Sequence, residues 1–196
     1  MDGVAGWFSA HPDMATCRPP VIHSVKSRLK AEDHLKEKLR RKYLEGDEVR
    51  FTPDMLGEVV TDLSGVRVMH LHQKQFSRIK ELLDAKLASG DWHLVETKAF
   101  TWDPESESYF RSLGLEPELR DTFYTSVHYI VRPKLNSRLV CEIQVRTLFE
   151  EIWGEVDHLL NYPDKTTNRS RHEQLRVLSK LVGAGSRLLD SIFLQD

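Results

Sequence analysis

The sequence has few cysteines and no long apolar segment. Only two of its 196 residues are cysteine, Cys17 and Cys141, which are too few for a disulfide framework and form no C-x-x-C pair typical of zinc or redox sites. The apolar runs are far shorter than the ~20 residues that span a bilayer, and the N-terminal segment lacks the pattern of a signal peptide. We therefore expect a cytoplasmic protein that does not associate with membranes.

Several common motifs are also missing. There is no G-x-x-x-x-G-K-[ST], no G-x-G-x-x-G and no H-E-x-x-H, which excludes a P-loop, a Rossmann phosphate cradle and a zincin-type protease. The composition, with 40% hydrophobic and 30% charged residues, is that of one globular domain, with or without a helical appendage. Pro12, Pro19 and Pro20, with no sustained periodicity around them, predict a loose N-terminal leader.

Positive charge is concentrated in one short segment. The net charge of −2 excludes a uniformly basic nucleic-acid coat, yet residues 26–42 contain eight Lys or Arg against three Asp or Glu, a local balance of +5. Such a segment suits a small anionic ligand, such as a nucleotide phosphate, and equally suits a solvated helix face.

Periodicity predicts helices interleaved with strands. Residues 32–45 form an amphipathic helix that carries His34, Lys38 and Arg41 on one flank. The polar stretch 103–122 is longer than an idle connection and predicts a mobile lid or acceptor loop. The other expected elements are strands at 66–71, 92–98, 124–131 and 139–146 and helices at 75–88, 147–162 and 171–193. In the last helix, Gly183 and Gly185 are candidate points of interruption. This order predicts an α+β fold, a mixed β-sheet flanked by helices.

Two of the predicted strands each have one face made of polar and aromatic side chains that are suited to binding or catalysis. Strict alternation places Tyr124, Ser126 and His128 on one face of the first strand. The same rule places Glu142, Gln144 and Arg146 on one face of the second. If the strands pair as a hairpin, an aromatic ring, an imidazole and a carboxylate converge, although a solvated sheet face would explain either strand alone.

Asp62 and Glu142 together could bind Mg²⁺, which accepts one or two protein carboxylates and completes its shell with water and phosphates. Phosphoryl transfer needs mainly a metal, cationic clamps and alignment, and the basic segment supplies clamps. His70 and His72 lack a third ligand and are better explained as structural residues.

The ordered motifs resemble the synthetase domain of RelA/SpoT-type alarmone synthetases. They are Ser27-Arg28-Leu29-Lys30, Glu37-Lys38-Leu39-Arg40-Arg41-Lys42, Asp62-Leu63-Ser64-Gly65-Val66-Arg67-Val68, Tyr124-Thr125-Ser126-Val127-His128-Tyr129, Glu142-Ile143-Gln144-Val145-Arg146-Thr147 and Trp153-Gly154-Glu155-Val156-Asp157-His158. The resemblance implies a leader (1–25), a nucleotidyltransferase-like synthetase domain (26–162) and a C-terminal helical extension (163–196). No His-Asp dipeptide of the hydrolase half of the long enzymes occurs.

The resemblance implies a pyrophosphokinase of the GTP diphosphokinase type, which transfers pyrophosphate from ATP to the 3′-hydroxyl of GDP or GTP with Mg²⁺ and so makes the alarmone (p)ppGpp of the stringent response. It assigns Asp62 and Glu142 to metal binding and catalysis. It assigns ATP binding to Arg28, Lys30, Lys38, Arg41 and Arg67, and acceptor binding to Tyr124, His128, Gln144 and Arg146.

Departures from the family pattern lie near the acceptor side: Phe123 and Thr125 flank the tyrosine, Asp121 replaces a basic residue and His34 replaces a serine. Two alternatives therefore stand beside a synthetase that uses GDP or GTP as acceptor. A toxic relative would modify the 3′ end of tRNA or an adenosine nucleotide, would have an antitoxin partner, and could use basic residues at the site's opening: Arg111, Arg120, Arg132, Lys134 and Arg138. A catalytically silent nucleotide-binding module would signal by assembly, and the C-terminal helix could join copies into a homo-oligomer.

Overall fold

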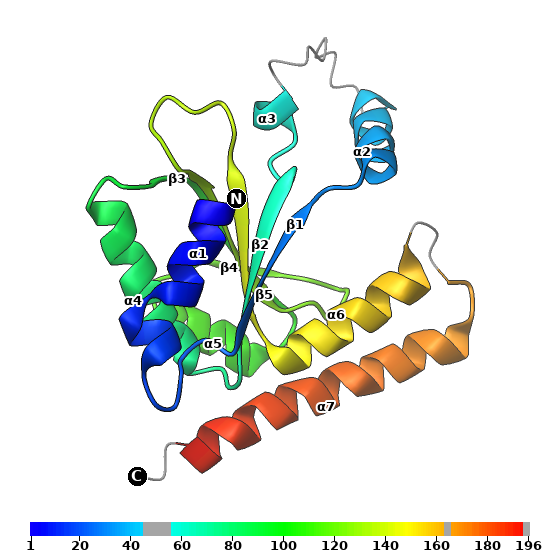
Figure 1. Ribbon diagram of the computed structural model, residues 1–196. Coiled ribbons are helices and arrows are strands. Elements are labelled where there is room, and N and C mark those ends of the chain that lie inside the picture. The colour runs from blue at the N-terminus through cyan, green and yellow to red at the C-terminus, as the bar shows by residue number, and fades with distance from the viewer. Residues whose placement is uncertain (45–55, 163–165, 194–196) are drawn as a thin grey trace.

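The computed structural model describes residues 1–44, 56–162 and 166–193. Its centre is a six-stranded mixed sheet in the order β1-β2-β6-β5-β3-β4 (Figure 1). β2 and β6 run parallel, β3 and β4 run parallel, and the other neighbours are antiparallel. The strands are β1 (Ser24–Leu29), β2 (Ser64–His70), β3 (His93–Thr101), β4 (Pro117–Leu119), β5 (Ser126–Arg132) and β6 (Cys141–Thr147). The predicted α+β fold is confirmed.

Helices cover both faces of this sheet. α1 and α4 lie on one face, whereas α6 and α7 pack against each other on the other side, and α2 stands apart beyond the end of β1 (Figure 1). The helices are α1 (Asp2–Ala10), a π-helical turn η1 (Pro12–Thr16), α2 (Glu32–Leu44), α3 (Leu56–Val59), α4 (Gln75–Ala88), α5 (Pro104–Ser112), α6 (Leu148–Asn161) and α7 (Arg169–Phe193). Among the described residues, no helix has both the length and the apolar character needed to cross a membrane.

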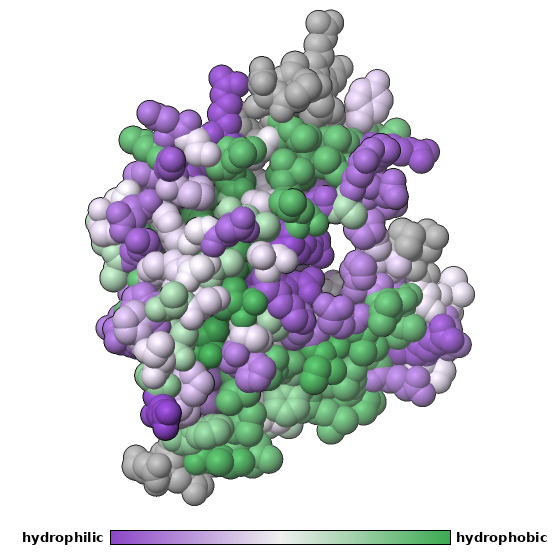
Figure 2. Space-filling model, viewed as in Figure 1, coloured by the Kyte–Doolittle hydropathy of each residue, from purple (hydrophilic) through white to green (hydrophobic). Residues whose placement is uncertain are grey.

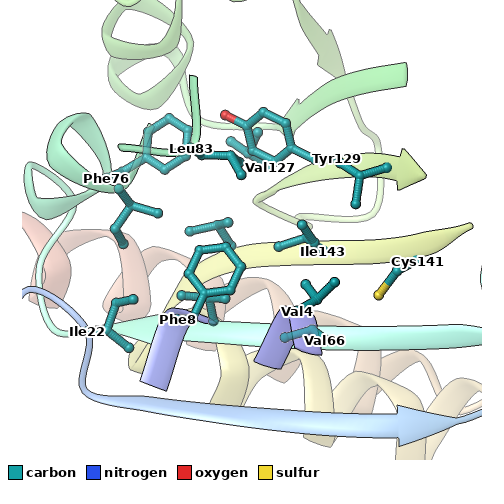
Figure 3. Close-up of a cluster of buried hydrophobic side chains, with 14 of the residues drawn as sticks. Val4, Phe8, Ile22, Val66, Phe76, Leu83, Val127, Tyr129, Cys141 and Ile143 are labelled. Carbon is teal, nitrogen blue, oxygen red and sulfur yellow. The ribbon is translucent and has the colours of Figure 1, made fainter. Parts of the chain in front are cut away.

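The core lies between the sheet and the first of these helix layers (Figure 3). Every second residue of β5 and β6 enters it, as the alternation predicts: Val127, Tyr129, Ile143 and Val145 are almost completely buried. β5 and β6 pair as an antiparallel hairpin, the condition under which their polar faces converge, with His128 opposite Gln144. Both strands therefore turn their polar residues to the other face.

Local signals gave good bounds for the helices that the sequence predicts. The predicted bounds of α4 match the structure, and the capping box at the start of α6 is present, with the Thr147 hydroxyl accepting from the Glu150 amide and the Glu150 carboxylate accepting from the Thr147 amide. The predicted last residue of α2, Glu45, lies outside the described residues.

The prediction of a loose N-terminal leader is wrong. Residues 2–10 form α1, which buries Val4 and Phe8 in the main core beside Val66 and Ile143 (Figure 3). Met14 of the following π-helical turn is also fully buried. The prolines lie after this helix, and only one i, i+4 apolar pair marks its inner face, so the periodic signal is short.

The prediction that residues 103–122 form a loop, as a mobile lid or an acceptor loop, is also wrong as to structure. This segment forms α5 and β4, and the Asp103 carboxylate caps α5 by accepting from the Ser106 amide at 3.1 Å. Pro104 occupies the first helical turn, where its missing N–H costs nothing. Phe110 buries the helix against Phe76 of α4. The proline that suggests a loop is therefore part of a helix start.

α7 runs without interruption through both of its central glycines. A Cβ on Gly185 would lie 2.9 Å from the Phe149 ring, so the glycine allows α7 to approach α6 closely. Near its C-terminal end, α7 is joined to the sheet by Asp190, whose carboxylate lies 2.6 Å from His72 Nδ1. The two histidines of the β2 end are thus structural, as expected, and burial lowers the pKa of His70 to about 4.

Candidate active site

A row of polar side chains crosses four strands on the face opposite the core. Lys26 of β1 is in register with Arg67 of β2, Arg67 with Gln144 of β6, and Gln144 with His128 of β5. Side chains at matched positions of neighbouring strands point to the same face. The sheet topology therefore brings residues more than 100 positions apart in sequence into one line.

Glu142 lies beside this row with both carboxylate oxygens engaged. Its Oε1 is 3.0 Å from His128 Nδ1, and its Oε2 accepts from Gln144 Nε2 at 2.8 Å. His128 in turn has its Nε2 2.9 Å from the Tyr124 hydroxyl. Burial raises the pKa of Glu142, but the contacts with His128 and Gln144 outweigh it and hold the pKa below its usual value. Glu142 is therefore a fixed carboxylate at neutral pH.

Asp62 follows α3 and precedes β2, and it is held between two lysines. Lys30 Nζ, just beyond β1, is 2.7 Å from Oδ2, and Lys38 Nζ of α2 is 2.7 Å from Oδ1. Burial raises the pKa of Asp62, but the two ammonium groups outweigh it and hold the pKa below 3.8. The Asp62 charge in turn raises the pKa of Glu142, so the two carboxylates lie close enough to repel each other.

Two adjoining clefts surround these carboxylates. The first has a volume of about 480 Å³, the second about 540 Å³, and Asn161 and Tyr162 line both. Figure 2 shows a hollow with hydrophilic side chains around it between α2 and α6. The first cleft includes the predicted residues Arg28, Arg67, Tyr124, Gln144 and Arg146. The second includes the predicted residues Lys30, Lys38, Arg41 and Asp62.

Nine of the eleven predicted site residues thus line one of the two clefts, and His128 and Glu142 are bonded directly to lining residues. The predicted ATP-binding set is divided, because its two arginines on β1 and β2 lie in the same cleft as the predicted acceptor residues. The structure therefore brings the predicted donor and acceptor ends together at Arg67 and Gln144, which are neighbours in register.

Sequence reasoning missed the acidic side of the first cleft. Arg67 Nη1 lies 3.1 Å from Glu151 Oε1 and 2.6 Å from Glu155 Oε1, both on α6. Although burial lowers the pKa of Arg67, these carboxylates raise it overall. The i, i+4 spacing of the two glutamates was a usable signal, since it places them on one helix face, but neither residue was assigned a role in the site from the sequence.

Tyr124 is presented by an unusual backbone. Phe123 has φ of +57°, in the left-handed region that favours glycine, and its ring contacts Trp102 edge-on at 5.3 Å. Phe123, which stands where the family pattern usually has glycine, therefore adopts a backbone conformation that favours glycine and adds an aromatic contact. Strain of about 1 kcal/mol or more at such a residue is typical of functional sites.

The residues present fit a magnesium ion, although no three His, Cys, Asp or Glu side chains gather into a metal cluster within the described ranges. Asp62 and Glu142 supply two ionised carboxylates, and the lysines around Asp62 could exchange it for phosphate oxygens. This is the donor set expected where substrate phosphates complete the coordination of Mg²⁺.

Comparison with known proteins relates this arrangement to one family. Residues 27–167 match the family described as a region found in RelA/SpoT proteins. The curated GTP pyrophosphokinase YjbM of Bacillus subtilis (strain 168) is 26% identical over 146 residues, which are 72% of this chain and 57% of that protein. The chain thus spans little more than half the length of this curated relative.

Solved structures show the same fold. Small alarmone synthetase 1 from Bacillus subtilis superposes with a TM-score of 0.68 at 21% identity, covering 97% of this chain and 84% of that one. A GTP pyrophosphokinase family protein from Streptococcus pneumoniae gives 0.64 at 21% identity, covering 87% and 75%. The Bacillus synthetase bound to its product pppGpp gives 0.64 at 20%, covering 99% and 88%. Because the family region covers most of the chain, the chain belongs to the RelA/SpoT family.

Proposed function

We propose that this protein transfers the β,γ-pyrophosphate of ATP to the ribose 3′-hydroxyl of GDP or GTP and so makes (p)ppGpp, in the cytoplasm where these nucleotides occur. The observation that carries the proposal is the pair of ionised carboxylates: Asp62 lines the cleft that contains the lysines, and Glu142 accepts a hydrogen bond from Gln144, which lines the cleft that contains Tyr124. The related Bacillus synthetase has been solved with pppGpp and with AMPCPP, which are nucleotides of the proposed kinds.

The ATP end of the site is cationic. Lys30 and Lys38 would release Asp62 and bind the phosphates, with Arg41 beside them in the same cleft. Arg28 and Arg67 flank the other cleft and would stack on the adenine, since guanidinium planes pack well on aromatic rings. The two lysines that pair with Asp62 are thus among the groups proposed to bind ATP.

The acceptor end is aromatic and polar. Tyr124 would stack on the base, while Gln144 and Arg146 line the same cleft and His128 ties Tyr124 to Glu142. In the proposed reaction the 3′ oxygen bonds to the β-phosphorus, the bond from that phosphorus to the α–β bridging oxygen breaks, and AMP leaves. Glu142 would accept the hydroxyl proton. Bound Mg²⁺ would neutralise charge that develops on the phosphate oxygens.

The structure offers less to the alternative acceptors. The groove beside Phe123 contains three carboxylates, Asp121, Asp157 and Glu173, with one arginine and one histidine, which is unfavourable for a polyanion such as tRNA. Of the basic candidates for tRNA contact, Arg111 is paired with Glu107 and Glu116, and Arg120 with Glu118. A silent module would have little use for two ionised carboxylates, one lining the lysine-containing cleft and one hydrogen-bonded to the lining of the other.

A labelling experiment tests the proposal. The purified protein is incubated with Mg²⁺ and γ-labelled ATP, with GDP, GTP, ATP or deacylated tRNA offered in separate reactions. The proposal predicts label on GDP or GTP. Label only on tRNA or on an adenosine nucleotide would support the toxic relative with its antitoxin, and label on no acceptor would support the silent module.

The outer face of α7 supports a further proposal, that copies of the chain associate through it. The inward residues of this helix include Ser179, Ser186 and Asp190, which are polar. Four of its outward residues are apolar and each is more than half exposed: Val177, Leu181, Leu188 and Ile192. Ile152 and Leu159 of α6 are exposed as well, and Figure 2 shows an apolar band across both helices. Such a patch on a monomer is unusual.

A second copy of this chain is the proposed occupant. These four apolar residues recur along the 25-residue helix at spacings of four and seven, which is the pattern of helices that pair. A two-fold axis would place identical stripes against each other. Antitoxin binding to this face is the competing explanation.

Replacing both Leu181 and Leu188 with Asp should therefore convert an oligomer into a monomer, as measured by light scattering after size exclusion. The matched control is Leu119→Asp on β4, where an equally exposed leucine stands outside the patch. A wild-type protein that is monomeric at every concentration tested would contradict the proposal.

A further inference from the structure

One buried carboxylate joins three strands of the site. Glu151, in the first turn of α6, is only 5% exposed, and its Oε1 lies 3.1 Å from Arg67 Nη1 of β2 and 3.3 Å from Lys26 Nζ of β1. Its Oε2 pairs with Arg146 of β6. Burial raises the pKa of Glu151, but these three cations outweigh it and lower the pKa, so the carboxylate stays ionised.

Arg146 is confined on every side by this arrangement. Its guanidinium is buried, faces the Tyr124 ring at 5.9 Å from the centroid, and contacts Glu151. It also fills the space above Gly154, where a Cβ would lie 2.7 Å from Arg146 Nη1. The glycine one turn along α6 therefore makes room for the guanidinium that Glu151 binds.

We propose that Glu151 is a positioning residue that aligns the donor and acceptor ends of the site with each other. The inference rests on the proposed function, in which Arg67 contacts the ATP base and Arg146 supports the Tyr124 platform. Both guanidinium groups are held by opposite oxygens of the one carboxylate, and Lys26 adds a third contact. Without that charge, three cations would share one region with no common partner, and each would move away from the others.

Replacing Glu151 with Gln keeps its size and removes its charge. We expect the dissociation constants for a non-hydrolysable ATP analogue and for GDP each to rise about tenfold, because ion pairs with two different arginines are lost. In the transfer reaction, KM for both nucleotides should rise more than kcat falls. The matched control is Glu155→Gln, since Glu155 is mostly exposed and contacts Arg67 alone. It should weaken only ATP binding, and by less.

Calorimetry with each nucleotide, alongside thermal unfolding, decides the outcome. If Glu151→Gln only lowers the unfolding temperature and the folded protein binds both nucleotides as tightly as wild type, Glu151 is merely structural and the inference is overturned. Weaker binding at one end alone would also overturn it. If the wild type binds both nucleotides but transfers no pyrophosphate, the proposed function is wrong. The comparison of nucleotide binding between the wild type and Glu151→Gln still tests the positioning role of Glu151.

A second variant covers the case in which Glu151→Gln does not fold. Gly154→Ala favours the helix yet places a Cβ against Arg146. It should raise the dissociation constant for GDP about threefold or more and leave that for the ATP analogue unchanged. Unchanged GDP binding in this stable variant would overturn the inference.

Discussion

Replacement of Glu142 by Gln is expected to lower kcat for pyrophosphate transfer by about a thousandfold or more, because the group that accepts the hydroxyl proton is removed. Gln has nearly the same size and can keep contacts with His128 and Gln144, so the fold should persist. Calorimetric titration should find the dissociation constant for the ATP analogue within about threefold of wild type, because the ATP phosphates are assigned to Lys30 and Lys38.

The control for this variant is Glu81→Gln on the outer face of α4, where the glutamate is exposed and pairs only with Arg78. It should retain full activity. If Glu142→Gln turned over at more than one tenth of the wild-type rate, Glu142 would not be the proton acceptor, and the mechanism would need another base.

Replacement of Asp62 by Asn is expected to have opposite effects on turnover and on metal-free ATP binding. Turnover should fall about a hundredfold or more, because the metal loses one of its two carboxylates. Binding of the ATP analogue in excess chelator should instead become severalfold tighter, because Lys30 and Lys38 no longer have a carboxylate at 2.7 Å that competes with phosphate.

Titrations with and without Mg²⁺ measure this reversal. In the wild type, Mg²⁺ should strengthen ATP binding by drawing Asp62 away from the lysines, whereas in Asp62→Asn the effect of Mg²⁺ should be largely lost. The control is Asp84→Asn on α4. This change also removes the carboxylate that pairs with a lysine, Lys80, but the pair lies outside the candidate active site. Weaker metal-free binding in Asp62→Asn would show that Asp62 orders the lysines instead of competing for them.

Alternation along the strands was the most informative sequence signal. A period of two places Glu142 and Gln144 on the face opposite Ile143, and the structure confirms this for β6 and for its hairpin partner β5. Strand pairing then follows from a short connection. The register that aligns Lys26 with Arg67 and Gln144 depends instead on contacts between distant segments, and local patterns do not contain it.

Proline and polarity misled the interpretation at both N-terminal and central segments. Pro104 lies in the polar stretch for which a loop was predicted, although a proline directly after the cap residue Asp103 is a signal for the start of a helix. α1 buries Phe8 completely, yet a nine-residue helix offers too few turns for its period to stand out. In both segments, packing against the sheet decides the structure, and that packing is a tertiary property.

The roles of the charged residues could be predicted only in part. The residue types and their order in the sequence identified the acidic and basic groups proposed to bind metal and phosphate. They did not predict that these groups pair directly with each other, as Asp62 does with Lys38. Glu151 was missed because its significance depends on three strands that meet beneath one helix turn. A single helix sequence does not indicate what lies below it.

The most direct test of the account is the adenine product of the reaction. Wild-type protein, Mg²⁺, GDP and ATP labelled in the adenine ring are allowed to react, and the labelled products are resolved against the amount of modified GDP. Transfer of pyrophosphate predicts one AMP for each modified guanosine nucleotide and no ADP. ADP as the matched product would indicate transfer of a single phosphate, and AMP without modified acceptor would indicate hydrolysis; either result would contradict the proposed function.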